Sequence, residues 1–381
     1  MDFAFNDEQE AFRQELRRFG TKVLAPHYQA DDRAGRQRPE LVAQMAGMGL
    51  TGLRVPARFG GQETGAVVAG MAAEEVGRAD FNAGYLLINT ALISDIIAAN
   101  ATEAQQAEWL PPIAAGQVIP SICVTEPGNG TDAANLRMVA RPDGDNWTLS
   151  GEKTSITLGM DAHTALVLAR TGGPGARGVS AFYVDLDHPA VSRSRFDDLG
   201  GRAIGRASLF FDDLPVAGDR LVGSLGEGFI SVMRGFDYSR AIIGLLCLGA
   251  AAVSLEETIT WARDRQAFGQ PIGRFQGVSF PLAEQAAYLR GARHVCYEAL
   301  WRKDAGLEHS AEAAMAKFWA PKLATEIIHQ CLLTFGNLGY STDSPLGQRL
   351  RDVIGLEIGD GTAQVSKLVI ARHLLGREYA P

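Results

Sequence analysis

The spacing of apolar positions predicts helices over the first third of the chain. Residues 1–118 contain several stretches in which apolar residues recur every three or four positions, as on one face of a helix. The first stretch carries Phe5, Phe12, Leu16, Phe19 and Val23. The Asn6-Asp7 pair can cap this helix, and further helical patterns cover residues 64–76 and 86–99. We expect the Pro111-Pro112 pair to break the last helix of this part, since proline cannot donate the backbone hydrogen bond that a helix needs.

From residue 119 to residue 228 the pattern changes to short alternating and β-branched runs, which are typical of strands. The expected strands are residues 146–149, 165–169, 179–184 and 206–211, with a glycine-rich loop at 172–175. Helical spacing then returns, and the expected helices are residues 240–264, 276–303, 312–335 and 362–375. Long amphipathic helices usually pack as a bundle. The sequence therefore predicts a helical domain (1–118), a small β-barrel or sandwich (119–228) and a helical bundle (229–381).

Composition and charge narrow the class of protein. The chain has 381 residues, of which 46% are hydrophobic and 21% charged, and its net charge of −8 argues against a nucleic-acid partner. No apolar run reaches the ~18–20 residues that span a bilayer, so we expect no membrane insertion. The acidic N-terminus fits neither a signal peptide nor a transit peptide. The cysteines and histidines lack metal-type spacing, so we expect no metal, reduced thiols and a cytoplasmic location.

The most informative segment is Cys123–Asp132, with the sequence CVTEPGNGTD. Its two glycines, proline and asparagine favour an irregular backbone, while Thr125, Glu126 and Thr131 add polar side chains. This combination favours a loop that presents N–H groups and hydroxyls to a ligand, and an ordinary surface turn is the alternative. The segment resembles the TEPxxGSD signature of the acyl-CoA dehydrogenase family, with Thr131 in place of serine.

Further segments are similar to motifs of the same family, in the same order. Residues 151–157 (GEKTSIT) resemble a GxKxWIT strand, with Ser155 where the family has tryptophan. Residues 263–272 (RDRQAFGQPI) resemble the family's turn between two long helices, and residues 358–364 (IGDGTAQ) align with its YEGTxQ turn. A looser match is the glycine turn at 335–340 (FGNLGY), for which a helix C-cap is the structural alternative.

The resemblance implies a fold that is mainly α with a central β-domain: an N-terminal helical domain, a middle β-barrel or sandwich and a C-terminal four-helix bundle. It implies an FAD-dependent enzyme that oxidises an acyl-CoA thioester at its α- and β-carbons. It also implies an electron-transferring flavoprotein as the acceptor and a homo-oligomer, most often a tetramer. The missing tryptophan at Ser155 leaves either a more open flavin site or compensation by another side chain.

The resemblance also implies which residues form the site. Arg265 would bind the pyrophosphate of a neighbouring subunit's cofactor, because its planar fork suits a diphosphate. A cation that complements the helix macrodipole is the alternative. The implied cofactor contacts are Cys123, Thr125, Gly130, Thr131, Ser155, Thr157, Arg265, Phe268, Gln276, Gly336, Thr362 and Gln364. The implied substrate contacts are Thr131, Asp237, Arg240 and Gly361.

Asp360 is the candidate catalytic base, because it aligns with the family's glutamate that removes the α-proton of the thioester. That step needs a desolvated base and donors to the thioester oxygen. A structural Asp-Gly turn is the alternative, and the other position at which family members carry the base is Ser239 here. Because aspartate is one methylene shorter than glutamate, we expect an acyl group that is bulky near its α- and β-carbons, such as cyclohexane-1-carboxyl-CoA or another branched acyl-CoA.

Three other functions remain compatible with the residues. The same fold could oxidise acyl groups tethered to a carrier protein, since both carriers present a phosphopantetheine. Ser155 in place of tryptophan leaves open a flavin monooxygenase or oxidase. A helical scaffold without a flavin is the non-enzymatic alternative. The residues that argue against this last function are Thr125, Thr157, Arg265, Thr362 and Gln364.

Overall fold

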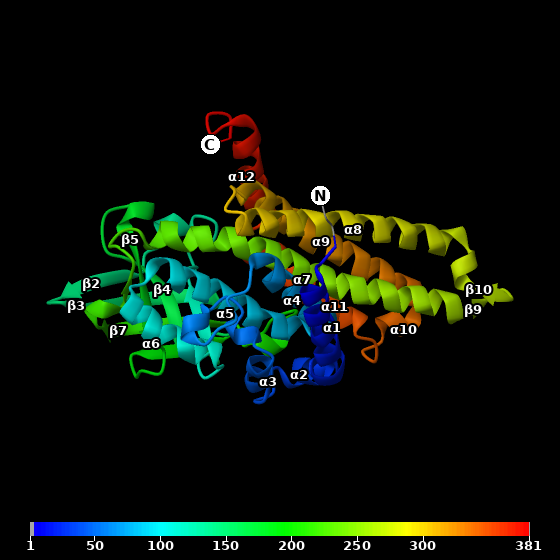
Figure 1. Cartoon of the computed structure of the whole chain (residues 1–381), viewed down its shortest axis with the longest axis horizontal. Helices are drawn as coiled ribbons and strands as arrows, with labels where there is room; N and C mark the ends of the chain where they lie inside the picture. The colour runs from blue at the N-terminus through cyan, green and yellow to red at the C-terminus, as the bar shows by residue number, and fades with distance from the viewer. Residues whose placement is uncertain (1–3, 381) are drawn as a thin grey trace.

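The computed structural model describes residues 4–380 and shows a long helical body with a β-domain at one end (Figure 1). The N-terminal helices are α1 (Asp7–Phe19), α2 (Tyr28–Ala34), α3 (Leu41–Gly47), α4 (Ala66–Ala79), α5 (Phe81–Asn100) and α6 (Glu103–Ala114). The Asn6 side chain accepts a hydrogen bond from the Gln9 backbone, and the Gln9 side chain accepts one from the Asn6 backbone. This capping box confirms the predicted start of the first helix.

The prolines of α6 do not end that helix, so the prediction that Pro111 and Pro112 break it is wrong. Both residues lie inside the helix, near its C-terminal end. Their neighbours Trp109, Leu110 and Ile113 are buried in a cluster that includes side chains of the sheet. Burial of these three side chains outweighs the two lost backbone donors, as tertiary packing commonly outweighs local preference.

The middle of the chain forms a sheet whose strand order is β6-β7-β3-β2-β4-β5-β8, with β1 beside β4. The strands are β1 (Pro120–Cys123), β2 (Val139–Asp143), β3 (Asn146–Ile156), β4 (Thr164–Arg170), β5 (Val179–Asp185), β6 (Val191–Arg195), β7 (Ala207–Val216) and β8 (Leu221–Val222). The four predicted strands are confirmed. The four others were missed because they are short, between two and five residues.

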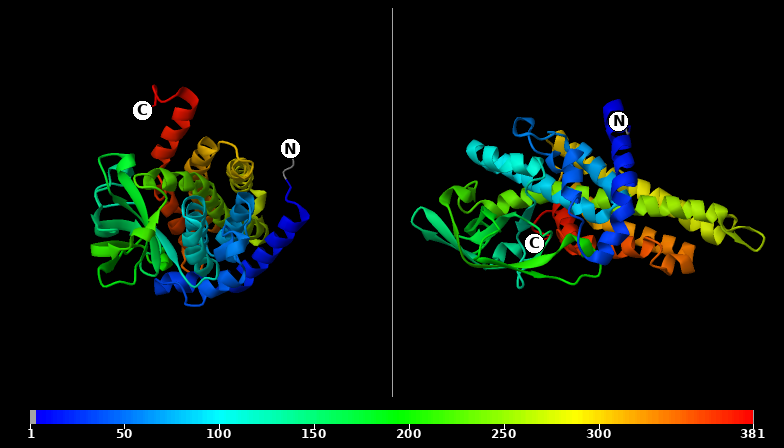
Figure 2. Two further views of the ribbon diagram at one scale, coloured as in Figure 1. Left: turned by 60° about the vertical axis from the view of Figure 1, so that its left-hand side comes forward. Right: turned by 90° about the horizontal axis from the view of Figure 1, so that it is seen from below.

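Alternation along β4 shows how the sheet joins the helical body. Leu166 and Leu168 belong to the cluster that includes α5 and α6, whereas Val167 and Ala169 pack with side chains of β3, β5 and β7. Successive side chains of a strand point to opposite faces, so both faces of this strand are covered. Figure 2 shows the sheet on one side of the helices and α1 on the other.

The C-terminal part is built on long helices, as predicted. They are α7 (Gly228–Asp264), α8 (Gln276–Asp304), α9 (Ser310–Phe335), α10 (Asn337–Tyr340), α11 (Leu346–Ile358) and α12 (Ala363–Leu375). The short strands β9 (Gln266–Ala267) and β10 (Gln270–Pro271) join α7 to α8. Helix α7 begins at Gly228, earlier than the predicted residue 240, because its apolar residues are buried from Val232 onward.

The bundle differs from the expectation in one member. Helix α11, which the sequence pattern did not reveal, packs against α9 and α7, whereas α12 packs against α9 and projects from the body (Figure 1). The turn between α11 and α12 consequently lies where the bundle ends and the projecting helix begins. This turn carries the candidate base.

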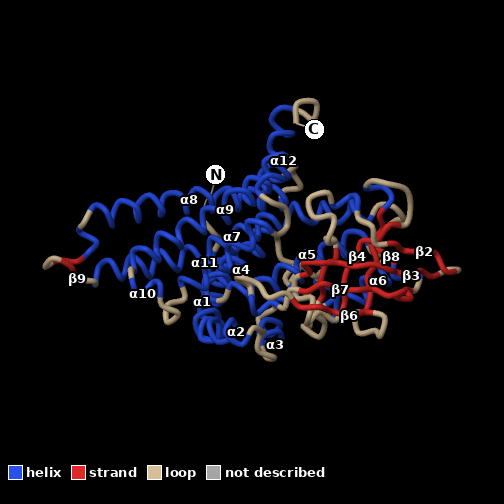
Figure 3. The backbone as a smooth tube through the Cα atoms, turned by 180° about the vertical axis from the view of Figure 1, so that it is seen from behind, coloured by secondary structure: helices blue, strands red, loops and turns tan. Residues whose placement is uncertain are grey.

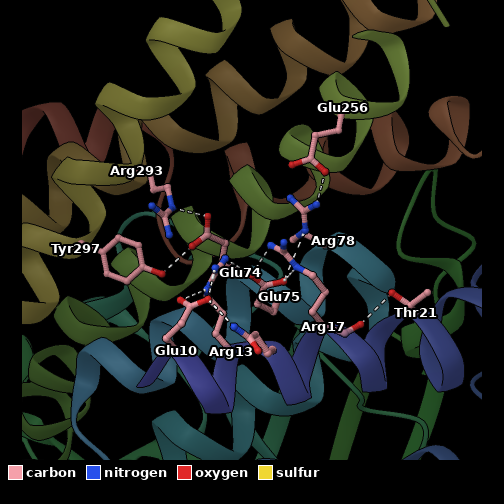
Figure 4. A network of polar contacts seen from close by, with 11 residues as sticks. Glu10, Arg13, Arg17, Thr21, Glu74, Glu75, Arg78, Glu256, Arg293 and Tyr297 are labelled. Carbon is pink, nitrogen blue, oxygen red and sulfur yellow. Dashed lines mark hydrogen bonds and ion pairs between the residues drawn. The ribbon is translucent and has the colours of Figure 1, made fainter. Parts of the chain in front are cut away.

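Ion pairs tie the first helix to the bundle (Figure 4). Glu75 of α4 is buried and pairs with Arg13 (3.4 Å) and Arg17 (2.8 Å) of α1. Its neighbour Glu74 accepts hydrogen bonds from Nε of Arg293 at 2.6 Å and from the hydroxyl of Tyr297 on α8 at 2.7 Å. Two adjacent carboxylates on one helix thus face opposite partners and fix α4 between α1 and α8.

Two helices, α5 and α7, are long and apolar enough to cross a membrane by length and composition alone. The expectation that no run reaches this length is therefore wrong. Most of each helix is buried in the core, which accounts for its apolar composition. The four cysteines are free and buried.

Candidate functional site

The loop after β1 is fixed by an internal ion pair. The buried Glu126 side chain accepts hydrogen bonds from the backbone N–H groups of Arg137 (2.6 Å) and Met138 (2.9 Å). It also accepts one from Nζ of Lys153 on β3, at 2.9 Å, and that lysine is fully buried. The carboxylate of the loop motif and the lysine of the strand motif therefore form one unit, and Glu126 serves the loop rather than a ligand.

Burial acts on both members of this pair. Burial would raise the pKa of Glu126, but the Lys153 ammonium and the two backbone donors hold that pKa below its usual value. Burial lowers the pKa of Lys153, an effect that the Glu126 carboxylate opposes. Lys153 also donates to the carbonyl of Val124 at 3.1 Å. The pair therefore sets the distance between the loop and β3.

The outer part of this loop is accessible. Gly130 and Thr131 are exposed, while Thr125 is half-buried and its carbonyl accepts a hydrogen bond from the Thr154 N–H at 2.9 Å. Cys123, by contrast, is fully buried in the β-domain core, and burial raises the pKa of its thiol to about 12. The Cys123 side chain therefore cannot contact a cofactor; only its backbone could.

An arginine contacts Ser155, the residue that stands at the position of the family's tryptophan. Ser155 lies at a bulge of β3 with φ of 61°, and its Oγ accepts a hydrogen bond from Nη1 of Arg206 at 3.0 Å. The guanidinium of Arg206 lies 4.4 Å from the centre of the Phe196 ring, and its Nε donates to Asp198 at 2.8 Å. Arg206 is therefore the candidate side chain for compensation, and compensation itself stays a prediction. Thr157, two residues further on, is half-buried, and its carbonyl accepts a hydrogen bond from a serine of β1.

Some of the implied cofactor residues lie at the other end of the molecule, near β9 and β10 (Figure 3). They are Arg265, Phe268, Gln276 and Gly336. The Arg265 guanidinium is exposed, lies 5.6 Å from the centre of the Trp261 ring and forms no ion pair within residues 4–380. Phe268 is 95% exposed, with φ of 52°. An unpaired arginine and an exposed aromatic ring suit a ligand or a second chain better than they suit this chain alone.

The glycine turn near Arg265 also has a structural role. Gly336 ends α9 with φ of 63°, which confirms the helix-cap alternative for this segment. The preceding Phe335 stacks on Trp261, with ring centres 5.0 Å apart. Because Trp261 contacts both Phe335 and Arg265, the glycine turn lies near Arg265. A cofactor contact of Gly336 stays a prediction.

Asp360 lies in the turn between α11 and α12 and has φ of 56°. The left-handed region is uncommon for a residue other than glycine, and such residues are frequent at functional sites. Gly361, with φ of 99°, follows it. Thr362 then caps α12 by accepting a hydrogen bond from the Val365 N–H at 3.4 Å. Gln364, in the first turn of α12, is exposed.

Two cations lie close to the Asp360 carboxyl. Burial raises the pKa of this carboxyl, while the charges of Lys317 and Arg240 act in the opposite direction. Nζ of the buried Lys317 donates to the carbonyls of Leu356 (2.7 Å) and Gly361 (2.9 Å). Asp360 is half-buried, and a partly desolvated acid with a raised pKa and nearby cations has the character of a general base.

Helix α7 supplies Asp237, Ser239 and Arg240. Nη1 of Arg240 donates to Asp237 at 2.6 Å, and the other oxygen of Asp237 accepts from the Ser310 hydroxyl at 2.7 Å. The Asp237 carboxylate therefore has two partners within the chain. Its implied contact with coenzyme A stays a prediction. Ser239 is fully buried and donates to a backbone carbonyl of its own helix, so it is not a base.

Tyr85 of α5 faces the same turn. Its hydroxyl lies 3.8 Å from the position that a methyl group at Gly355 would occupy, and it forms no hydrogen bond with another described residue. Burial, together with the charge of Asp360, raises the pKa of this phenol well above its usual value. The Tyr85 hydroxyl and Gly355 therefore lie next to each other near the candidate base.

Four side chains at these places were not identified from the sequence: Tyr85, Lys153, Arg206 and Lys317. Within residues 4–380, no group of three or more histidine, cysteine, aspartate or glutamate residues could hold a metal ion. An open hollow of about 500 Å³ in the β-domain is lined by eight residues, none of which is a predicted site residue.

Three family models match the chain, and together they cover nearly all of it. They are the N-terminal domain (residues 6–117), the middle domain (121–214) and the C-terminal domain (226–375) of acyl-CoA dehydrogenase. The chain belongs to the acyl-CoA dehydrogenase family, and the predicted fold class is confirmed.

Curated relatives and solved structures agree with this membership. The chain is 35% identical to the short-chain specific acyl-CoA dehydrogenase of Bos taurus mitochondria, over 96% of this chain and 90% of the relative. It is 33% identical to the probable acyl-CoA dehydrogenase YngJ of Bacillus subtilis, over 98% and 100%.

Among solved structures, the butyryl-CoA dehydrogenase of Megasphaera elsdenii superposes with a TM-score of 0.95 at 30% identity, over 98% of this chain and 100% of that one. A structure described as the electron transferring flavoprotein of Acidaminococcus fermentans gives 0.96 at 32% identity, over 98% and 100%. PigA with FAD and proline gives 0.95 at 26% identity, over 99% and 100%.

Proposed function

We propose that this protein is an FAD-dependent acyl-CoA dehydrogenase in which Asp360 removes the α-proton of the thioester. The observation that carries the proposal is the Asp360 turn, where a half-buried carboxyl with φ of 56° and a raised pKa lies near Lys317 and Arg240. Family membership supports the reaction class. A structural Asp-Gly turn would not need two cations around its carboxyl.

The residues present fit the cofactor. Exposed Thr131 and half-buried Thr125 and Thr157 offer hydroxyl groups in and next to the loop after β1 and at the end of β3. These residues would hold FAD, which would supply the acceptor for the hydride of the β-carbon. The unpaired Arg265 suits its pyrophosphate, because an arginine fork makes charge-assisted hydrogen bonds to phosphate oxygens.

We further propose that the site is shared between copies of the chain. Arg265 directly precedes β9, whereas Thr131 lies between β1 and β2 of the sheet, and β9 and the sheet lie at opposite ends of the molecule (Figure 3). One cofactor could therefore meet both residues only if a second copy supplied one of them. A homo-oligomer, and by family resemblance a tetramer, meets this requirement. The exposed Phe268 beside Arg265 is compatible with such an interface.

Asp360 has what proton removal requires. Burial destabilises its charged form in the resting protein and so increases its basicity toward the α-carbon. Its backbone N–H forms no hydrogen bond with another described residue and is free to donate to the thioester oxygen, where charge develops. Proton and hydride then leave from adjacent carbons, and an α,β-double bond forms.

The proposed acyl group is compact and bulky near its α-carbon. One of the curated relatives named above is a short-chain specific enzyme, which favours a small acyl group. The shorter base and the glycines at 355, 359 and 361 favour an acyl group that is wide at its α-carbon. A methyl group added at Gly355 would contact only the Tyr85 hydroxyl. Cyclohexane-1-carboxyl-CoA and α-branched acyl-CoAs combine these properties. We also propose that the enzyme is cytoplasmic and passes its electrons to an electron-transferring flavoprotein.

The test is anaerobic flavin bleaching by a panel of thioesters, run on the wild type and on Asp360→Asn. We expect bleaching by compact branched or cyclic acyl-CoAs and a rate about 100- to 10,000-fold lower in the variant. Unchanged bleaching in the variant would exclude Asp360 as the base. Fast bleaching by butyryl-CoA with none by ring thioesters would exclude the substrate proposal. Bleaching by carrier-tethered acyl groups alone, or rapid reoxidation by air, would point to the alternative functions.

A further inference from the structure

Lys317 is a buried lysine whose hydrogen bonds all go to neutral groups. It lies on α9, and its side chain is 1% exposed. Nζ donates to the Leu356 carbonyl at the end of α11 and to the Gly361 carbonyl just before α12. Lysine is almost never fully buried unless it is paired, so an ammonium placed here has a cost in free energy that needs a reason.

The two carbonyls flank Asp360 in the sequence. A single ammonium therefore joins the end of one helix to the start of the next across the turn that carries the carboxyl. The turn needs such support, because Asp360 has φ of 56°, and a residue in that region costs of the order of 1–3 kcal/mol unless its surroundings impose it. Gly359 and Gly361 on either side provide little stiffness of their own.

The charged and titratable groups that face the turn come from four helices. Helix α5 supplies Tyr85, α7 supplies Arg240, α9 supplies Lys317 and α11 supplies Glu357. The buried thiol of a cysteine on α7 also lies near the lysine. Lys317 and Arg240 are the two positive charges of this group, and the Arg240 guanidinium is already hydrogen-bonded to another carboxylate.

We propose that Lys317 is a positioning residue for the base: it fixes the turn in the geometry that aims Asp360 and balances the charge of that carboxylate. The proposal rests on the proposed function, because it requires Asp360 to be the base. It goes beyond that function in naming a residue that touches neither substrate nor cofactor and still sets the rate.

The first test is Lys317→Met, which keeps a similar length while removing the charge and both hydrogen bonds. We expect kcat/KM at its plateau to fall about 10- to 100-fold, because a displacement of the order of 1 Å has effects of this size. We expect the acidic limb of the pH profile to move to higher pH by about 1–3 units, since an opposite charge at close range lowers a carboxyl pKa by that amount. Lys322→Met, on the exposed side of the same helix, is the matched control and should leave both unchanged.

A second variant separates position from charge and remains informative if the first does not fold. Lys317→Gln keeps a hydrogen-bond donor but has no charge, so we expect the same shift of the acidic limb with a smaller loss at the plateau. A pH profile that superposes on the wild type in the folded variants would overturn the proposal, even if the melting temperature falls. If Asp360→Asn kept full activity, the proposed function itself would fail; the two failures are thus distinguishable.

Discussion

Among residues 4–380, Lys153 and Lys317 are both buried, but one is paired with a carboxylate and the other with backbone carbonyls. Lys153, under the loop after β1, forms an ion pair with Glu126 at 2.9 Å, and that carboxylate accepts two further backbone hydrogen bonds. Lys317, under the turn after α11, bonds two carbonyls and leaves the nearby Asp360 without a hydrogen bond to it. The first lysine satisfies a carboxylate, and the second leaves one available.

The difference follows from what each carboxylate has to do. A carboxylate that receives three donors is stabilised in its charged form and is a poor base, whereas a desolvated carboxylate without donors is reactive. The pKa of Glu126 is accordingly lowered and that of Asp360 raised. One site uses a buried charge for structure, and the other uses it for chemistry.

The largest effect should follow from breaking the structural pair. Lys153→Met leaves Glu126 buried and unpaired, which should cost about 3–5 kcal/mol in the free energy of unfolding. Denaturant unfolding measures this loss. Adding Glu126→Gln to the same chain should restore part of it, because the uncompensated charge is gone. Equal stability of Lys153→Met and the wild type would show that the pair has no structural role.

A change at the reactive carboxylate should alter selectivity rather than stability. Asp360→Glu extends the base by one methylene, so the ratio of kcat/KM for butyryl-CoA over cyclohexane-1-carboxyl-CoA should rise by about tenfold or more. Steady-state kinetics with both thioesters checks this, and Lys322→Met serves as the reference variant. A ratio equal to that of the wild type would mean that base length does not select the acyl group.

Asp80 and Asp352 are two further buried carboxylates whose pKa is raised. Burial raises the pKa of Asp80 from 3.8 to about 7 and that of Asp352 to about 6. Their contribution to the free energy of unfolding is therefore complete below pH 3.8. It is lost as pH rises through about 6 for Asp352 and about 7 for Asp80. The loss is no more than about 1.4 kcal/mol per pH unit for each group. Asp80→Asn cannot ionise and still caps α5. Urea unfolding at pH 5 and pH 8 should show a smaller loss for Asp80→Asn than for the wild type.

The exposed Asp143→Asn is the control for that comparison and should behave like the wild type. An Asp80→Asn variant with the full pH dependence would place the titration elsewhere in the molecule.

The smallest effect is expected at Ser155. Ser155→Ala removes the hydrogen bond from Arg206, which the Asp198 pair and the Phe196 ring still hold in place. A partly exposed hydrogen bond contributes about 0.5–1.5 kcal/mol, so the dissociation constant of FAD should change by less than about tenfold. Fluorescence titration of the apoprotein measures it. A much larger loss would mean that Arg206 depends on Ser155 to cover the flavin.

The sequence predicted the fold because its signals are local and repeated. Helical spacing located the long helices, and alternation located four strands, although Pro111 and Pro112 misled because packing outweighed them. Helix α11 was missed because glycine and buried charged residues interrupt its pattern. The motif segments gave the positions of the loop, the bulge at Ser155 and the Asp360 turn.

The lysines could not be recognised, for a physical reason. Lysine is expected at the surface, so nothing in the sequence marks Lys153 or Lys317 as buried. The sequence places Glu126 in a ligand-facing loop, because its actual partner Lys153 lies 27 residues away and leaves no local signal. Tyr85 lies near Asp360 and Arg206 contacts Ser155, and only the folded structure brings these distant parts of the chain together.

The most direct test of the account isolates proton removal from hydride transfer. A thioester in which sulfur replaces the β-carbon has no β-hydride to lose, so in D2O the base can only exchange the α-protons for deuterium. Mass spectrometry of the recovered thioester should show deuterium with the wild type and Lys322→Met, slower uptake with Lys317→Met, and uptake with Asp360→Asn reduced about 100- to 10,000-fold. Equal uptake by Asp360→Asn and the wild type would contradict the central claim that the Asp360 carboxylate is the base.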